Sequence, residues 1–128
     1  NGNIVTFNIE PSSMIISYLT LQFIHPRSRQ AVFEKVYESL EPGGAFFLFE
    51  KIRAPTARLQ DIMGQLYLDF KLEQGFNEAE IVNKQRSLKG VLEPLSTHEW
   101  LDMAQQAGFT EVATVMRYIC FEGILAIK

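Results

Sequence analysis

Residues that build disulfides and soft-metal sites are scarce in this sequence. One cysteine, Cys120, and two histidines, His25 and His98, occur among its 128 residues. A single cysteine excludes a disulfide within the chain and a cysteine-rich metal site. Two isolated histidines without a nearby cysteine or paired carboxylates do not predict a zinc site. We therefore expect no bound metal, and we expect a cytoplasmic location because disulfides mark oxidising compartments.

Long apolar runs and a strong net charge are also missing. The longest strongly apolar stretch, near residues 45–49, is far shorter than the ~18 residues of a membrane span. The first residues do not form a basic segment followed by an apolar one, so no signal peptide is predicted. The sequence carries 12 Lys and Arg against 15 Asp and Glu, a formal net charge of −3. Neither a membrane nor direct nucleic-acid binding is expected from this balance.

The first half of the sequence predicts a parallel strand–helix–strand unit. Residues 13–19 and 45–50 are short apolar runs, typical of strands buried on both faces. Residues 26–40 mix apolar and charged side chains with the spacing of an amphipathic helix. Residues 41–44, Glu-Pro-Gly-Gly, end that helix because proline cannot continue it and glycine accepts positive φ. Two buried strands joined by a helix are typical of a parallel pair.

The second half predicts helices followed by a pair of strands. Residues 58–74 and 78–88 have helical spacing, and residues 96–99, Ser-Thr-His-Glu, form a capping box that opens a helix. Residues 110–118 and 119–128 are rich in Val, Ile, Phe and Ala, which favours a terminal antiparallel pair. With 47% hydrophobic residues and no linker, the whole chain is expected to form one α/β domain.

Three local motifs resemble the later half of class I S-adenosylmethionine (SAM) methyltransferases. They are the strand at residues 14–19, the turn at residues 40–45 (Leu-Glu-Pro-Gly-Gly-Ala), and residues 106–109 (Gln-Ala-Gly-Phe). The resemblance implies the later half of a Rossmann-like methyltransferase sheet, with parallel strands, an antiparallel terminal pair and a helical insert at about residues 57–93. Residues 1–128 would then be a partial class I methyltransferase domain.

Within that superfamily the sequence is similar to the carboxy-SAM synthases. Those enzymes make carboxy-SAM from SAM and prephenate for the modification of tRNA wobble uridine. The likeness runs from about residue 2 to the end of the chain and covers only the later half of such an enzyme. The matching residues are Ser13-Met14, residues 20–23, residues 42–45, Glu50-Lys51, residues 69–71, Glu80-Ile81, Lys84, residues 107–109 and residues 126–128.

The glycine-rich loop that cradles the cofactor in this family has no counterpart in the sequence. No G-x-G pattern follows a strand and opens a helix, as such a loop must. The resemblance implies that an N-terminal half with the cradle is absent from this chain. It also implies that this chain supplies the side of the site that contacts the adenine of the cofactor and the side that contacts the acceptor. An exposed strand edge invites association, so we expect pairing with that missing half or a homodimer.

The resemblance places three residues beside the cofactor. Asn3 and Ile4 match an Asp-Ile pair that lies beside adenine, and an asparagine oxygen can accept a hydrogen bond from the exocyclic amine. Tyr18 stands where the family has an asparagine at the tip of a strand. The alternatives are a frayed terminus for Asn3 and an aromatic ring that fills the edge of the core for Tyr18.

Two further residues carry the hypothesis of carboxylate recognition. Gln85 stands where the family has an arginine that holds the added carboxylate, and Arg86 follows one position later. One position rotates a helical side chain by about 100°, so Arg86 points elsewhere unless the helix shifts in register. Arginine suits a carboxylate because its planar fork donates paired hydrogen bonds. The alternative is an exposed arginine on a helix that also carries Lys84 and Lys89.

Three more residues are candidates for contact with the acceptor. Glu50 follows the second strand and could orient the acceptor or act as a base; the alternative is a solvated pair with Lys51. Tyr67 lies in the insert that forms the acceptor lid in this family; the alternative is an ordinary amphipathic helix. His25 faces the expected mouth of the sheet and is a candidate base, whereas His98 is expected to serve the start of its helix.

Three functions remain open at this point. The first is methyl transfer from SAM to a small-molecule acceptor, which needs little acid–base chemistry because the protein mainly positions the acceptor. For that reason no pronounced catalytic constellation is expected, and the catalytic residues are left unassigned. The second is synthesis of carboxy-SAM from SAM and prephenate, and the third is a non-catalytic interaction module. The expected cofactor is SAM or carboxy-SAM.

Overall fold

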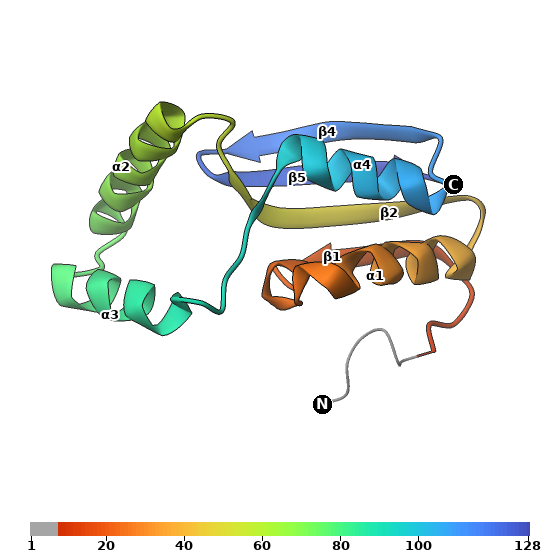
Figure 1. Cartoon of the computed structure of the whole chain (residues 1–128), viewed down its shortest axis with the longest axis horizontal. Coiled ribbons are helices and arrows are strands. Elements are labelled where there is room, and N and C mark those ends of the chain that lie inside the picture. The colour runs from red at the N-terminus through yellow and green to blue at the C-terminus, as the bar shows by residue number, and fades with distance from the viewer. Residues whose placement is uncertain (1–7) are drawn as a thin grey trace.

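A computed structural model describes residues 8–128 as a mixed sheet with helices (Figure 1). The strand order is β1-β2-β5-β4, with the short β3 paired to the end of β2. β1 and β2 are parallel, and β5 is antiparallel to both β2 and β4. The predicted parallel pair and the predicted antiparallel terminal pair are therefore both confirmed. The strands are β1 (Ser12–Tyr18), β2 (Leu40–Arg53), β3 (Leu95–Ser96), β4 (Glu111–Tyr118) and β5 (Phe121–Ile127).

The four α-helices of residues 8–128 fall into two groups. α1 (Pro26–Ser39) and α4 (Thr97–Ala107) lie side by side on one face of the sheet, whereas α2 (Ala57–Glu73) and α3 (Glu78–Leu88) extend beyond one end of it (Figure 1). Every helix predicted from the sequence is present within a few residues of its expected bounds. A short 3-10 turn, η2 (Leu21–Phe23), follows β1 and was not predicted.

Local side-chain signals set the helix ends. The predicted capping box is confirmed: Ser96 Oγ accepts a hydrogen bond from the Glu99 N–H (3.3 Å), and Glu99 Oε1 accepts one from the Ser96 N–H (3.1 Å). A second box joins Asn77 and Glu80 at the start of α3. Gly108 ends α4 in the left-handed region, with φ of 118°, where a glycine carries no steric penalty.

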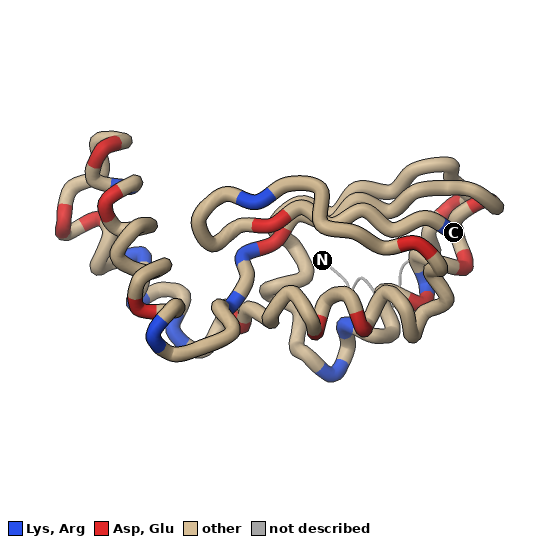
Figure 2. Tube along the Cα trace, turned by 90° about the horizontal axis from the view of Figure 1, so that it is seen from above, with Lys and Arg blue, Asp and Glu red and all other residues tan. Residues whose placement is uncertain are grey.

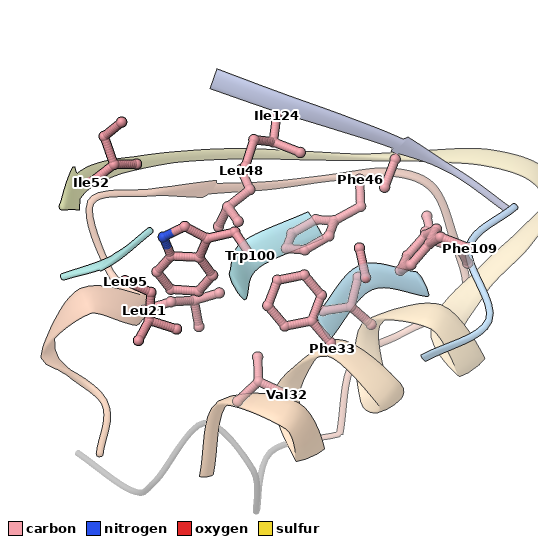
Figure 3. Close-up of a cluster of buried hydrophobic side chains, with 14 residues drawn as sticks. Leu21, Val32, Phe33, Phe46, Leu48, Ile52, Leu95, Trp100, Phe109 and Ile124 are labelled. Carbon is pink, nitrogen blue, oxygen red and sulfur yellow. The ribbon is translucent and has the colours of Figure 1, made fainter. Parts of the chain in front are cut away.

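The hydrophobic core lies between the sheet and the α1–α4 layer (Figure 3). Trp100 has no exposed surface and belongs to this core. The Phe33 ring meets the Phe46 ring edge-on, with centroids 5.6 Å apart. Each such buried side chain stabilises the fold by roughly 1.5–3 kcal/mol. The cluster comprises Leu21, Val32, Phe33, Val36, Leu40, Phe46, Leu48, Ile52, Leu95, Trp100, Ala104, Phe109, Ile124 and Ala126.

Within residues 8–128, the opposite face of the sheet is largely uncovered, with α1 and α4 both on the other side (Figure 2). Met14, Ile16 and Tyr18 alternate along β1 and are 55%, 62% and 65% exposed. The expectation that this strand is buried on both faces is therefore wrong within residues 8–128. The apolar run is typical of a doubly covered strand, but no element of the described chain covers its second face. Among the described strands, β1 is also an edge strand that pairs with β2 alone.

Two glycine substitutions provide a matched test of the packing around α4. A Cβ on Gly108 would lie 2.8 Å from the Tyr37 ring, whereas one on Gly64, inside α2, meets nothing within 4 Å. We expect Gly108→Ala to lower the free energy of unfolding by about 1–3 kcal/mol. Gly64→Ala should raise it by about 1 kcal/mol, because alanine favours an exposed helix. Denaturant titration measures both, and equal effects would contradict the packing described for Gly108.

Candidate functional site

An aromatic cavity opens where the parallel strands β1 and β2 end. Carboxyl ends of parallel strands share one edge of a sheet, which is where open α/β folds place their ligands. This cavity has a volume of about 270 Å³ and a nearly apolar lining. We call it the aromatic pocket; it is lined by Tyr18, Leu19, Phe49, Tyr67, Phe70, Met116, Tyr118, Ile119 and Phe121.

Rings from three strands and α2 stack to form the wall of the aromatic pocket. Tyr18 and Phe49 are nearly parallel, with centroids 5.2 Å apart, and Phe49 stacks in turn on Phe121 at 5.9 Å. Tyr67 meets Phe121 edge-on at 5.4 Å, so α2 closes one side of the row. Offset stacking and edge-on contacts are the geometries that aromatic quadrupoles favour. The result is a set of ring faces and edges at the mouth of the sheet.

Backbone strain is concentrated at the rim of the aromatic pocket. Leu19 and Ile119 have φ of 50° and 52°, and they are the described non-glycine residues with positive φ. Such a conformation costs of order 1–3 kcal/mol for a bulky residue. The Leu19 N–H donates to the Phe49 carbonyl at 2.8 Å, which ties the end of β1 to β2. Strain held by neighbouring structure at a cavity rim is typical of a functional site.

Of the residues singled out from the sequence, Tyr18 and Tyr67 are brought together here. They lie far apart in the chain, on β1 and α2, and both line the aromatic pocket. Tyr18 does not fill the edge of the core, because most of its side chain is exposed. Phe49, Phe121 and Tyr118 were not predicted, since their strand patterns alone do not reveal which face they occupy.

A second cavity, of about 450 Å³, lies between α2 and α3 and shares Tyr67 and Phe70 with the aromatic pocket. Its lining also includes Lys71 and Lys84, with Glu80 at the start of α3. We call it the insert cavity. It lies next to the aromatic pocket through the two shared rings.

The insert cavity does not include the two residues proposed for carboxylate recognition. Gln85 and Arg86 lie on α3 and are exposed, and neither appears in the lining of this cavity or of the aromatic pocket. Their neighbour Lys84 faces the cavity instead. Adjacent helical positions point about 100° apart, which explains why only one of the three reaches it.

Glu50 lies on the other side of the sheet from the aromatic pocket. Its carboxylate is 1% exposed and accepts hydrogen bonds from the backbone N–H groups of Thr20, Leu21 and Gln22. The alternative of a solvated pair with Lys51 is thus wrong, because neighbouring strand residues point to opposite faces. Burial raises the pKa of Glu50 from 4.5 to about 7, against the opposing effect of these donors.

A buried arginine completes the support of the loop after β1. Arg29 donates from Nε to the Ile24 carbonyl (2.8 Å) and from Nη2 to the Gln22 carbonyl (2.9 Å), and its guanidinium lies 5.5 Å from the Trp100 ring centroid. Burial lowers its pKa, although the charges of Glu93 and Glu50 act in the opposite direction. Glu50 and Arg29 therefore hold η2 from two sides.

The histidines lie outside the aromatic pocket. His25 is exposed at the N-cap of α1, where its Nδ1 accepts from the Arg27 N–H at 3.2 Å. His98 lies in the first turn of α4 and contacts Asp102 at 3.2 Å. Asn3 and Ile4 lie outside the described residues. Within residues 8–128, no group of three or more His, Cys, Asp and Glu side chains is arranged to hold a metal ion.

A third cavity, of about 630 Å³, lies beside the start of α4. The buried Glu122 forms part of its lining and accepts hydrogen bonds from the hydroxyls of Thr97 and Thr114. Arg53 and Arg117 also line it.

Of the described helices, none is long and apolar enough to cross a membrane.

Sequence comparison finds relatives that are named carboxy-S-adenosyl-L-methionine synthase. The chain is 40% identical over 122 residues to a protein of Staphylococcus epidermidis named carboxy-S-adenosyl-L-methionine synthase, covering 95% of this chain and 54% of that protein. A protein of the same name from Shewanella oneidensis is 38% identical over 129 residues, covering 99% and 52%. The chain spans about half the length of these curated relatives and matches their carboxyl-terminal half. No protein-family model matches the chain.

Solved structures with the same fold include methyltransferases. Human N-acetylserotonin methyltransferase in complex with SAM superposes with a TM-score of 0.63 at 14% identity, covering 99% of this chain and 32% of that one. An O-methyltransferase family 2 protein from Planctomyces limnophilus, in complex with apigenin, gives 0.66 at 16% identity, covering 99% and 34%. The fold is therefore the later part of a Rossmann-like methyltransferase sheet, as the sequence resemblance implied.

The buried carboxyl group of Glu50 predicts a pH-dependent stability. Its pKa is about 7 in the folded protein and near 4.5 when exposed, so between these values the folded state retains a proton that the unfolded state releases. Stability therefore falls as pH rises through this window. Glu50→Gln removes the titration, so its stability relative to the wild type should improve by about 2–3 kcal/mol from about pH 5 to about pH 8.

Denaturant titration across that pH range measures the effect. Glu38→Gln, an exposed position on α1, serves as the control and should run parallel to the wild type. A Glu50→Gln profile that also runs parallel to the wild type would show that the carboxyl group keeps its ordinary affinity for protons.

Proposed function

We propose that this chain supplies the acceptor-facing wall of a SAM-dependent transferase. The observation that carries the proposal is its similarity, along almost its whole length, to proteins named carboxy-S-adenosyl-L-methionine synthase. The position of the aromatic pocket supports it, because the cavity opens at the carboxyl edge of the parallel pair. The whole protein's activity is inferred from these two facts together.

The residues of the aromatic pocket suit a sulfonium cofactor. A ligand cation is attracted to the face of an aromatic ring, and the pocket presents several rings with little competing polar surface. Tyr18 would offer its exposed ring and hydroxyl at the strand end. Bound SAM would supply an electrophilic carbon next to its sulfonium centre. No glycine-rich cradle occurs among residues 8–128, so this chain would hold one side of the cofactor only.

Two transfers fit this site, and different observations favour them. Carboxy-SAM synthesis is favoured by the names of the relatives. Methyl transfer to a small-molecule acceptor is favoured by Gln85, which replaces the expected arginine, and by the exposed position of Arg86 outside the insert cavity. We propose carboxy-SAM synthesis as the first candidate because the similarity extends along the chain, whereas the second candidate rests on two adjacent positions, Gln85 and Arg86.

A small molecule is the proposed acceptor in either case. The aromatic pocket, at about 270 Å³, lies near the lower end of the range for small-molecule sites. The net charge of −3 does not favour a direct nucleic-acid partner. The remaining part of the protein is proposed to cover the exposed face of β1 and to pair with its free edge. A second copy of the chain is the alternative occupant of that edge.

Titration calorimetry of the protein that carries this chain with SAM tests the proposal. We expect binding in the micromolar range, weakened about tenfold by Tyr18→Ala through the loss of a ring face. Tyr37→Phe is the matched control, since Tyr37 packs on Phe109 on the helix-covered side. The intact mass of the purified protein, compared with the 14.6 kDa of these 128 residues, establishes how long the whole polypeptide is. Absence of binding by the whole protein would favour the non-catalytic interaction module.

Incubation with SAM and prephenate distinguishes the two transfers. If the first candidate is correct, mass spectrometry will show SAM gaining one carboxyl group only when prephenate is present. SAM that stays unmodified under these conditions, although it binds, would favour methyl transfer. Omitting the protein controls for spontaneous chemistry.

A further inference from the structure

Two lysines from distant parts of the chain converge on one ring of the aromatic pocket. Lys51 lies near the end of β2 and Lys71 lies on α2, and their Nζ atoms are 5.0 and 4.5 Å from the centroid of Tyr67. Both side chains are partly buried. A cation over an aromatic face gains about 0.5–1 kcal/mol, but the ring does not neutralise the charge. Two ammonium groups therefore share one uncharged partner.

No acidic side chain balances these charges in the described part of the chain. Within residues 8–128, neither Lys51 nor Lys71 forms an ion pair of the kind that joins Arg53 to Glu99. Burial lowers the pKa of Lys71, and the charges of Lys51 and Lys84 lower it further.

Two acidic groups near this cluster, Glu80 and Cys120, do not compensate for it. Glu80, the acid in the lining of the insert cavity, accepts from the Asn77 N–H at 3.1 Å in the capping box of α3. Cys120 is 2% exposed, and burial raises the pKa of its thiol. The cluster is therefore a concentration of positive charge beside an apolar cavity.

We propose that Lys51 and Lys71 bind a carboxylate group of the small-molecule substrate, whose apolar body occupies the aromatic pocket. This inference rests on the proposed function and assigns the residues that would select its substrate. An anion between two partly buried ammonium groups gains Coulomb energy that water screens only partly. Lysine suits this role as a mobile point charge. Lys84, exposed at the rim of the insert cavity, adds a weaker, longer-range attraction.

The proposal predicts that Lys71→Met weakens carboxylate binding without lowering the stability of the ligand-free protein. In the ligand-free protein, Lys71→Met removes a partly desolvated charge and its repulsion with Lys51, so thermal stability should stay equal or rise. The same substitution should weaken carboxylate binding about tenfold. If the role of Lys71 were merely structural, its substitution would lower the thermal stability of the protein. The site would then not distinguish an anion from a neutral molecule of the same shape.

Phenylacetate and phenylacetamide are the probe pair, since they share an aromatic body and differ in charge. NMR titration of the protein that carries this chain should show phenylacetate binding at least tenfold more tightly than phenylacetamide. Lys51→Met and Lys71→Met should each abolish most of this preference, and added NaCl should reduce it in the wild type. Lys89→Met, exposed at the end of α3, is the matched control and should retain it.

Equal binding of the two probes, or an unchanged preference in both variants, would overturn the inference. SAM titration of the same variants separates this failure from failure of the proposed function. If SAM binds the wild type and the probe preference is absent, the transferase proposal stands without the lysine site. If SAM does not bind at all, the proposed function fails first.

Discussion

A carboxylate buried on one side of the sheet holds the loop that shapes the cavity on the other side. Glu50 accepts hydrogen bonds from three consecutive backbone N–H groups of residues 20–22, and Arg29 binds carbonyls of the same loop. The chain leaves β1 at Tyr18 and Leu19, so this anchoring also sets where the exposed tyrosine ring projects. The positive φ of Leu19 is maintained because the hydrogen bonds to Glu50 and Arg29 fix the residues that follow it.

Local signals explain why most of the fold could be predicted from the sequence. Apolar runs of strand length, a Pro-Gly-Gly turn and a Ser-Glu capping box act over a few residues, so their consequences can be deduced without knowledge of distant contacts. The burial of Arg29 could not be deduced, because its position fits the charged face of an amphipathic helix. The prediction that both faces of β1 are buried was wrong for a related reason. The apolar composition of β1 suits burial on both faces, but whether a second layer covers it depends on segments distant in sequence.

The candidate site depended on contacts that span the chain, and it was predicted only in part. Tyr18 and Tyr67 were found because one ends a parallel strand and the other lies in the insert. Phe121 was not, since its contact with Tyr67 depends on how α2 packs against the end of the sheet. Gln85 and Arg86 were placed by register alone, and the helix turns both of them away from the described cavities.

The position of β5 has a consequence for how the chain folds. This last strand lies between β2 and β4, pairing Ala45 with Ile127 and Glu111 with Ile127. Until residues 121–127 have been synthesised, β4 has no partner within residues 8–128 that joins it to the rest of the sheet. Formation of the sheet must then await contacts between residues more than half the chain apart, and non-local pairing of this kind is slow. Chaperones would encounter this chain with β2 still exposed as an open edge.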